Sequence, residues 1–88
     1  MTIAFVPKAW EDYCFWQEND QELLAKVNML IRDISRDPFK GIGKPEPLRG
    51  NLAGYWSRRI SGEHRLVYRV SGAKPDQLIT IVQAKFHY

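Results

Sequence analysis

The sequence predicts an α+β fold in which an N-terminal helical hairpin packs on one face of a mainly antiparallel, twisted β-sheet. Three observations predict it. Apolar residues between positions 23 and 34 recur with the 3.6-residue period of an amphipathic helix. Residues 55–68 contain two β-rich runs around a Ser-Gly-Glu turn, which is typical of a β-hairpin. The turn between the two predicted helices is short, and the sheet is the element available to cover their apolar face.

Length and composition indicate one globular domain spanning residues 1–88, because 44% of the residues are hydrophobic and 26% are charged. The single cysteine, Cys14, has no intramolecular partner, which favours a reducing compartment. The apolar run at the N-terminus is short and ends at Pro7, unlike a signal peptide. No apolar segment approaches the roughly 20 residues of a membrane-spanning helix. We therefore expect a soluble, cytoplasmic protein that does not bind a membrane.

The first elements are a short strand over residues 3–6 and a helix over residues 8–18. Pro7 stops the strand and suits the first turn of the helix. The helix carries aromatic residues at spacings of three and four, and we interpret that face as core packing rather than base stacking. These residues are Trp10, Tyr13, Phe15 and the neighbouring Trp16.

The second helix has the clearest amphipathic period in the chain. Asn19 or Asp20 is expected to cap it, and Asn19 with Glu22 has the spacing of a capping box. The dipeptide Asp37-Pro38 is expected to end it, because the residue before a proline is pushed out of the helical conformation. Its apolar positions are Leu23, Leu24, Val27, Leu30, Ile31 and Ile34.

Residues 38–51 form a loop with three prolines and three glycines. Glu46 lies between Pro45 and Pro47, which restrict the backbone and hold the carboxylate in a defined place. A polar residue on a stiff loop is a candidate for function. The spacing alone favours a solvated acid in a proline-rich connector.

Three further strands are expected over residues 48 or 51 to 60, 64–71 and 77–86, with Gly54 as a bulge in the first. Alternation predicts that Arg65, Val67 and Arg69 lie on the face away from the helices, which we call the open face. The complementary set on the helix-covered face is Leu66, Tyr68 and Val70.

The turn length decides how the arginines of the hairpin pair. A three-residue turn places Arg59 opposite Arg65, so that both lie on the open face, and a two-residue turn breaks this pairing. Arg58 has the opposite parity and is expected to be structural or peripheral. Residues 38–88 carry nine basic and three acidic side chains, against four and seven in residues 1–37. This half is either a polyanion-binding surface or an ordinary solvated one.

The polar residues suit cleavage of RNA without a metal ion. Glu46 is a possible base, His87 an acid or base near neutral pH, and Arg65 with Arg59 a cation for a phosphoryl group. Tyr88 adds a phenol and a terminal carboxylate. DNA lacks the 2′-hydroxyl nucleophile, so the set implies RNA. The alternative is that the last two residues are a frayed tail.

The sequence contains no phosphate-binding glycine loop and no cluster of metal ligands, so we expect neither a cofactor nor a metal. A thiol nucleophile formed by Cys14 and His87 is disfavoured, because Cys14 lies on the apolar face of its predicted helix.

The chain closely resembles the YoeB (Txe) toxins of the RelE superfamily along its whole length. The residues that carry the resemblance are PFKGIGKPEPL at 38–48, NL at 51–52, WSRRI at 56–60, EHRLVY at 63–68 and the terminal HY at 87–88, together with Trp10, Asp12, Tyr13, Trp16 and Gln17. One departure is the turn at residues 72–77, which is a few residues longer than usual and lies away from these motifs.

The resemblance implies a RelE-like, microbial ribonuclease-like toxin of a type II toxin–antitoxin pair that cleaves mRNA in the ribosomal A site. It implies Glu46 as general base, His87 as general acid, Arg65 as phosphate and transition-state stabiliser, and Tyr88 as a positioning residue. Arg59 and Lys44 are implied as substrate contacts.

The implied partner is a YefM/Axe-type antitoxin that neutralises the toxin and, together with it, represses their operon. A homodimer is common in the family, and the sequence leaves it open. Two alternatives remain: a non-catalytic relative that inhibits DNA gyrase by binding it, and an RNA-binding module without turnover.

Overall fold

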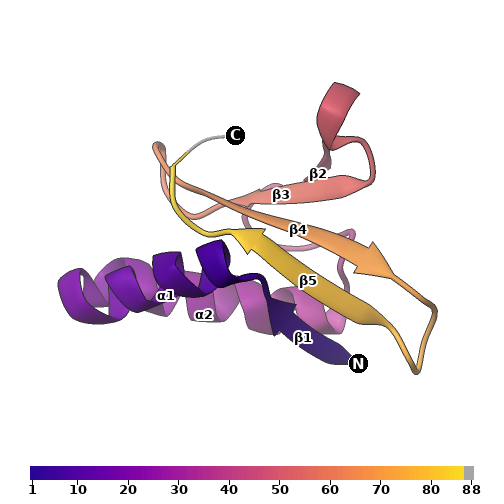
Figure 1. Ribbon diagram of the computed structural model, residues 1–88, viewed down its shortest axis with the longest axis horizontal. Coiled ribbons are helices and arrows are strands. Elements are labelled where there is room, and N and C mark those ends of the chain that lie inside the picture. The colour runs from indigo at the N-terminus through magenta and orange to yellow at the C-terminus, as the bar shows by residue number, and fades with distance from the viewer. Residues whose placement is uncertain (87–88) are drawn as a thin grey trace.

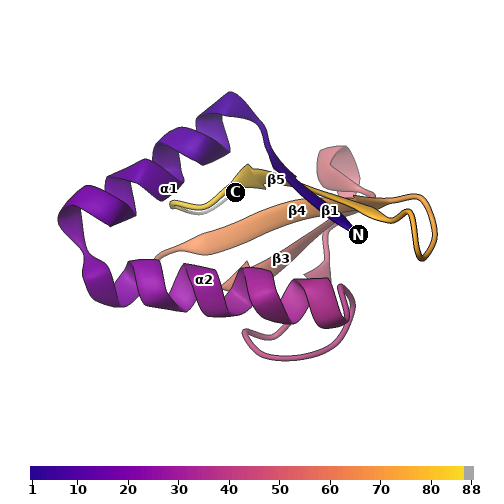
Figure 2. The ribbon, with the colours of Figure 1, turned by 90° about the horizontal axis from the view of Figure 1, so that it is seen from below.

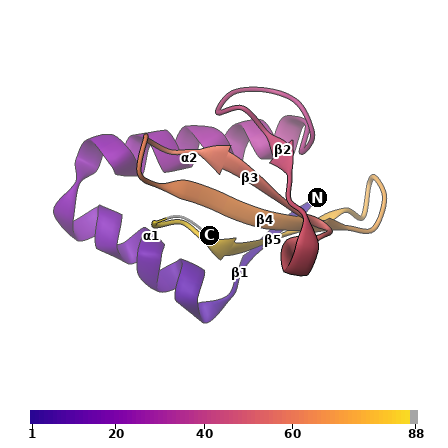
Figure 3. The ribbon, with the colours of Figure 1, turned by 90° about the horizontal axis from the view of Figure 1, so that it is seen from above.

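The computed structural model describes residues 1–86, which form two helices and a five-stranded sheet (Figure 1). The strand order is β1-β5-β4-β3-β2, with β1 parallel to β5 and every other pair antiparallel. Both helices pack on one face of the sheet (Figures 2 and 3), which confirms the predicted fold class. In chain order the elements are β1 (Thr2–Phe5), α1 (Pro7–Asn19), α2 (Gln21–Arg36), β2 (Glu46–Pro47), the 3-10 turn η1 (Gly50–Leu52), β3 (Tyr55–Arg59), β4 (Arg65–Ser71) and β5 (Leu78–Gln83).

The helices begin where the sequence predicts. Pro7 is the first residue of α1, a position where the missing N–H costs no hydrogen bond. Asp20 caps α2, because its side chain accepts a hydrogen bond from the N–H of Leu23 at 3.0 Å. Asn19 is instead the last residue of α1, and its side chain donates to the carbonyl of Phe15. Within residues 1–86 no helix is both long and apolar enough to cross a membrane.

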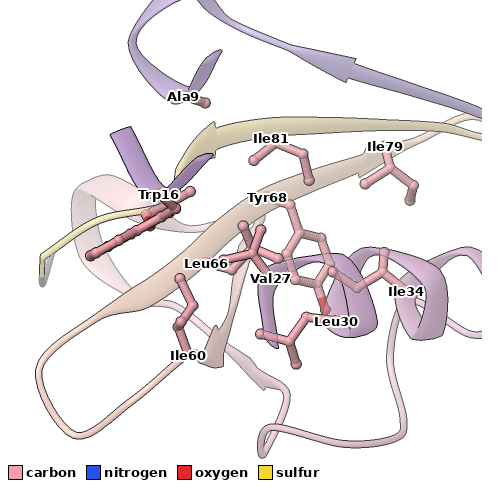
Figure 4. Close-up of a cluster of buried hydrophobic side chains, with 11 residues drawn as sticks. Ala9, Trp16, Val27, Leu30, Ile34, Ile60, Leu66, Tyr68, Ile79 and Ile81 are labelled. Atoms are coloured by element: carbon pink, nitrogen blue, oxygen red, sulfur yellow. The ribbon is translucent and has the colours of Figure 1, made fainter. Parts of the chain in front are cut away.

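The hydrophobic core lies between the helices and the sheet (Figure 4). Val27, Leu30 and Ile34 of α2 are fully buried, as their helical period predicts. The predicted aromatic face of α1 is only partly core: Trp16 is buried, but Trp10 is 51% exposed and Phe15 is 39% exposed. The strand residues in this core are Leu66, Tyr68, Ile79 and Ile81.

The largest differences between the predicted and observed strand boundaries are in the strands predicted over residues 48–60 and 77–86. The expected strand ending at residue 60 is wrong in its first half, because the chain turns through η1 and β3 begins only at Tyr55. Gly54 has φ +93° in the turn before β3, so it is not a bulge. The final strand ends at Gln83 rather than at Phe86, whose φ of +65° is incompatible with an extended strand.

Arg58 is fully buried on the helix-covered face, so of the two expected roles, structural and peripheral, the structure supports the structural one. Its guanidinium donates to the hydroxyl of Tyr68 at 3.1 Å and to a carboxylate oxygen of Asp33. The hydroxyl of Tyr68 in turn donates to the carbonyl of Pro38 at 2.6 Å. The remaining acceptors of the guanidinium are the backbone carbonyls of Asp37, Lys40 and Ile42. One buried cation thus connects α2, the sheet and the loop after α2.

Two glycines let this loop lie close to the core. Gly41 has φ +138°, and a Cβ there would lie 1.9 Å from Oδ2 of Asp33. Gly43 has φ +79°, and a Cβ there would lie 2.7 Å from Cδ2 of Leu30. The carbonyl of Gly43 accepts a hydrogen bond from the N–H of Arg59 at 2.7 Å, so the end of the loop lies beside the edge of β3.

Replacing Arg58 with methionine is expected to lower the free energy of unfolding by about 3–5 kcal/mol, because the carboxylate of Asp33, the hydroxyl of Tyr68 and three backbone carbonyls lose the buried donor that Arg58 provides. Urea denaturation measures the change. The control is Arg69→Met, which removes an exposed arginine from the adjacent strand and should change the stability by less than about 0.5 kcal/mol. Equal stability of the two variants would contradict the structural role of Arg58.

Hydrogen bonds from Arg36, from Arg58 and from the N–H of Ile42 lower the pKa of Asp33 from 3.8 to about 2. A depressed folded-state pKa contributes stability above the unfolded value, and that contribution is lost as the pH falls from about 4 towards 2. Asp33→Asn should therefore make stability less dependent on pH in this window, as measured by urea denaturation at several pH values. An unchanged pH dependence, matching that of an exposed-acid control, Asp76→Asn, would contradict the prediction.

Candidate functional site on the open face

The site begins with a row of residues across the open face. Glu46 of β2 pairs with Ser57 of β3, Ser57 pairs with Val67 of β4, and Val67 pairs with Gln83 of β5. Side chains of directly paired residues point to the same face, so the row joins four strands. Ser57 and Val67 are buried, whereas Glu46 is exposed at the sheet edge. The proline-flanked residue Glu46 is thus held by strand pairing, in addition to the stiff backbone that the sequence predicts.

Arg59 and Arg65 lie opposite each other, two residues along from this row and on the same face. The N–H of Ile60 bonds to the carbonyl of His64 at 3.0 Å, which closes a three-residue turn. The structure therefore confirms the side-by-side arginines that this turn length predicts. Lys44 lies two residues before the start of β2, and the carbonyl of its neighbour Gly43 accepts the N–H of Arg59. The backbone of Lys44 consequently lies at the same end of the sheet.

The side chain of Arg65 is held at the hairpin turn. Its Nη1 donates to the carbonyls of Ser61 at 2.8 Å, His64 at 3.1 Å and Gly62 at 3.3 Å. The side chain is partly exposed, so the cation is positioned by the backbone and still reaches solvent. Arg59 is exposed. One arginine of the pair is therefore preorganised by the turn, which favours electrostatic stabilisation of a fixed anionic group.

Gln83 reaches the open face through an irregularity that sequence alternation does not predict. Strict alternation places residue 83 with Ile79 and Ile81 on the helix-covered face. The register shifts between Val67 and Tyr68, because Tyr68 pairs with Ile81 while Val67 pairs with Gln83. One extra residue on β5 therefore turns Gln83 over to the open face.

The segment after β5 is held by side chains from two distant parts of the chain. The N–H of Ala84 donates to Oδ2 of Asp12 at 3.0 Å, and its carbonyl accepts from the indole N–H of Trp16 at 2.8 Å. The N–H of Phe86 donates to Nδ1 of His64 at 2.7 Å. These contacts support the expectation that the chain end is tied to the sheet, as far as Phe86.

The predicted site residues His87 and Tyr88 lie outside the described residues. Sequence reasoning missed how side chains hold the segment before them. It treated Trp16 as a core aromatic and Asp12 only as part of a resemblance, and it gave His64 no role. These hydrogen bonds join residues 22 to 72 positions apart, so no local pattern in the sequence indicates them.

The site combines an acid with several cations. A cavity of about 440 Å³ opens beside Glu46 and is also lined by Pro47, Leu48 and Arg49. Lys44, Arg59 and Arg65 lie towards the hairpin end. Within the described chain no three His, Cys, Asp or Glu residues are grouped so as to hold a metal ion. A carboxylate that can accept a proton and arginines that can bind an anionic phosphodiester thus share one face.

Comparison with known proteins identifies the family of the chain. Residues 5–88 match the family described as the YoeB-like toxin of bacterial type II toxin–antitoxin systems. The chain is 57% identical to the toxin YoeB of Streptomyces coelicolor over 88 residues, which cover both chains completely.

Solved structures show the same likeness. A YoeB/ParE toxin from Agrobacterium tumefaciens is 52% identical, with complete coverage of both chains and a TM-score of 0.95. A heterotetrameric YoeB–YefM complex and a YoeB dimer from Staphylococcus aureus each contain a chain 48% identical to this one, with 100% and 98% of the two chains covered and TM-scores of 0.87 and 0.88. The chain therefore belongs to the YoeB-like toxins of bacterial type II toxin–antitoxin systems.

Proposed function

We propose that this toxin is a ribosome-dependent mRNA endoribonuclease that works by general acid–base catalysis without a metal ion. The observation that carries the proposal is the open face, where strand pairing brings Glu46, Arg59 and Arg65 together. The segment that leads to His87 joins this assembly, because the carbonyl of Phe86 accepts the N–H of Arg65 at 3.0 Å. A base, a cation and the approach to an acid therefore come from four separate parts of the chain.

The proposed reaction is an in-line attack within the RNA backbone. Glu46 accepts the proton of a 2′-hydroxyl, and the 2′-oxygen forms a bond to the adjacent phosphorus. Arg65, with Arg59 beside it, stabilises the charge on the non-bridging oxygens. His87 gives a proton to the departing 5′-oxygen as the P–O bond breaks, leaving a 2′,3′-cyclic phosphate and a 5′-hydroxyl. Tyr88 positions the reacting groups, and Lys44 contacts the substrate.

The proposed partners follow from the same family. The Staphylococcus aureus complex pairs a similar chain with YefM, so we expect a YefM/Axe-type antitoxin to bind and neutralise this toxin. Toxin and antitoxin together would repress their operon, with operator DNA contacted through the antitoxin. The substrate is mRNA in the ribosomal A site, which places the activity in the cytoplasm. The Staphylococcus aureus YoeB dimer supports a homodimer here.

Replacement of either proposed proton-transfer residue, as Glu46→Gln or His87→Gln, should slow cleavage of ribosome-bound mRNA by about 10²–10⁴-fold while leaving the fold intact. Primer extension after cell-free translation measures the new mRNA ends. The exposed control, Arg69→Ala, should cleave as the wild type does. Wild-type rates in both site variants would refute the assignment. New ends absent even with the wild type, together with inhibited DNA supercoiling, would identify a gyrase-binding toxin instead.

The two arginines should differ in the kinetic parameter that they affect. Arg65→Ala should lower kcat by about 10²–10³-fold, because the backbone-held guanidinium is preorganised for the transition state. Arg59→Ala should mainly raise KM, since an exposed arginine that contacts the substrate contributes to ground-state binding. Single-turnover cleavage at several ribosome concentrations separates the two parameters. The reverse assignment, or identical effects of the two substitutions, would contradict this division of roles.

A further inference from the structure

We propose that His64 is a positioning residue, which holds the chain immediately before the C-terminal acid by accepting the N–H of Phe86 on its Nδ1. This inference rests on the proposed role of His87 and assigns a role to a residue outside the proposed reacting groups. Phe86 is covalently bonded to residue 87, so the location of its backbone determines where residue 87 begins. A misplacement of about 1 Å in a reacting group is enough to cost on the order of 100-fold in rate.

The geometry of His64 suits this role. The residue lies between the hairpin turn and β4 and is only 8% exposed. Its ring meets the indole of Trp16 edge-on, with centroids 4.8 Å apart, and the ring of Phe86 at 5.5 Å. The side chain therefore packs between the helical layer and the end of the chain. Its Nδ1 lies 2.7 Å from the backbone nitrogen of Phe86.

The contact of Nε2 with Glu63 explains why Nδ1 of His64 is free of a proton and can accept a hydrogen bond. Nδ1 can accept a hydrogen bond only when it carries no proton, so a neutral ring bears its proton on Nε2. Nε2 lies 3.1 Å from Oε1 of Glu63, which can accept that proton in a hydrogen bond. Glu63 thereby favours the tautomer that leaves Nδ1 available to Phe86. The imidazole of His64 thus bridges the carboxylate of Glu63 in the hairpin turn and the backbone N–H of Phe86.

The backbone at Phe86 needs such support. Its φ of +65° lies in the left-handed region, which is unfavourable for a residue with a Cβ. Its carbonyl is held as well, by the N–H of Arg65 at 3.0 Å and by Nε2 of Gln83 at 3.2 Å. Both backbone polar groups of Phe86 are therefore hydrogen-bonded, and His64 contributes the contact with the N–H. The hairpin that carries Arg65 therefore also holds the backbone of Phe86, the residue before residue 87.

The test compares two polar, uncharged substitutions that differ in where they place an oxygen. In His64→Asn the side-chain carbonyl can occupy the place of Nδ1, whereas in His64→Gln it extends to the place of Nε2. We expect His64→Asn to keep kcat within about threefold of the wild type. We expect His64→Gln to lower kcat on the order of 100-fold with little change in KM, because the arginines of the open face remain.

Two measurements keep this result separate from folding and from the proposed function. Urea denaturation should show both variants folded, and His64→Leu replaces His64→Gln if the latter is unfolded. Amide hydrogen exchange should show Phe86 protected in the wild type and in His64→Asn, and exchanging faster in His64→Gln or His64→Leu. This readout requires no cleavage, so it tests the contact even if the wild type proves not to be a nuclease.

Three results would overturn the positioning role. The first is unchanged Phe86 exchange in every variant, which would show that Nδ1 does not hold the amide. The second is equal loss of kcat in His64→Asn and His64→Gln, which would indicate ring packing rather than the hydrogen bond. The third is full activity of His64→Gln despite faster exchange at Phe86, which would show that the contact does not serve catalysis.

Discussion

The buried guanidinium of Arg58 is the constraint on which the rest of the structure depends. A buried cation must be both paired and hydrogen-bonded, and Arg58 meets this requirement with Asp33, Tyr68 and three carbonyls of the loop after α2. These bonds hold the loop against the helix-covered face of the sheet. The chain then pairs with β3 as the edge strand β2. Glu46 occupies the first position of that strand. A structural arginine on one face of β3 thus helps to place a candidate catalytic base, Glu46, on the other.

The core and the site are coupled through the chain end. Trp16 packs in the hydrophobic core and also donates to the carbonyl of Ala84, while Asp12 of the same helix accepts the N–H of Ala84. His64 adds the contact with Phe86. Substitutions in α1 can therefore alter the proposed active site without touching the open face. Stability and activity need to be measured together for any variant of these residues.

The sequence predicts the elements that rest on local patterns. The apolar period of α2, the cap at Asp20 and the alternation in β4 arise from neighbouring residues, and each is confirmed. The parity of Arg58 and Arg59 follows from the same alternation, so their location on opposite faces is predictable, whereas the full burial of Arg58 is seen only in the structure. The exposed Trp10 is the main failure on α1, because spacing indicates a face without indicating how far the sheet covers it.

What the sequence by itself determined is therefore the fold class and the amphipathic helix. It left the pairing of Arg59 with Arg65 open until the structure showed a turn of three residues. Only the tertiary structure decided that Glu46 lies on an edge strand, that Gln83 turns to the open face, and that His64 holds Phe86. The physical reason is the separation along the chain between the residues that interact. Periodicity and turn chemistry act over a few residues, whereas strand pairing, a bulge and a side-chain contact over 22 residues depend on how the finished layers meet.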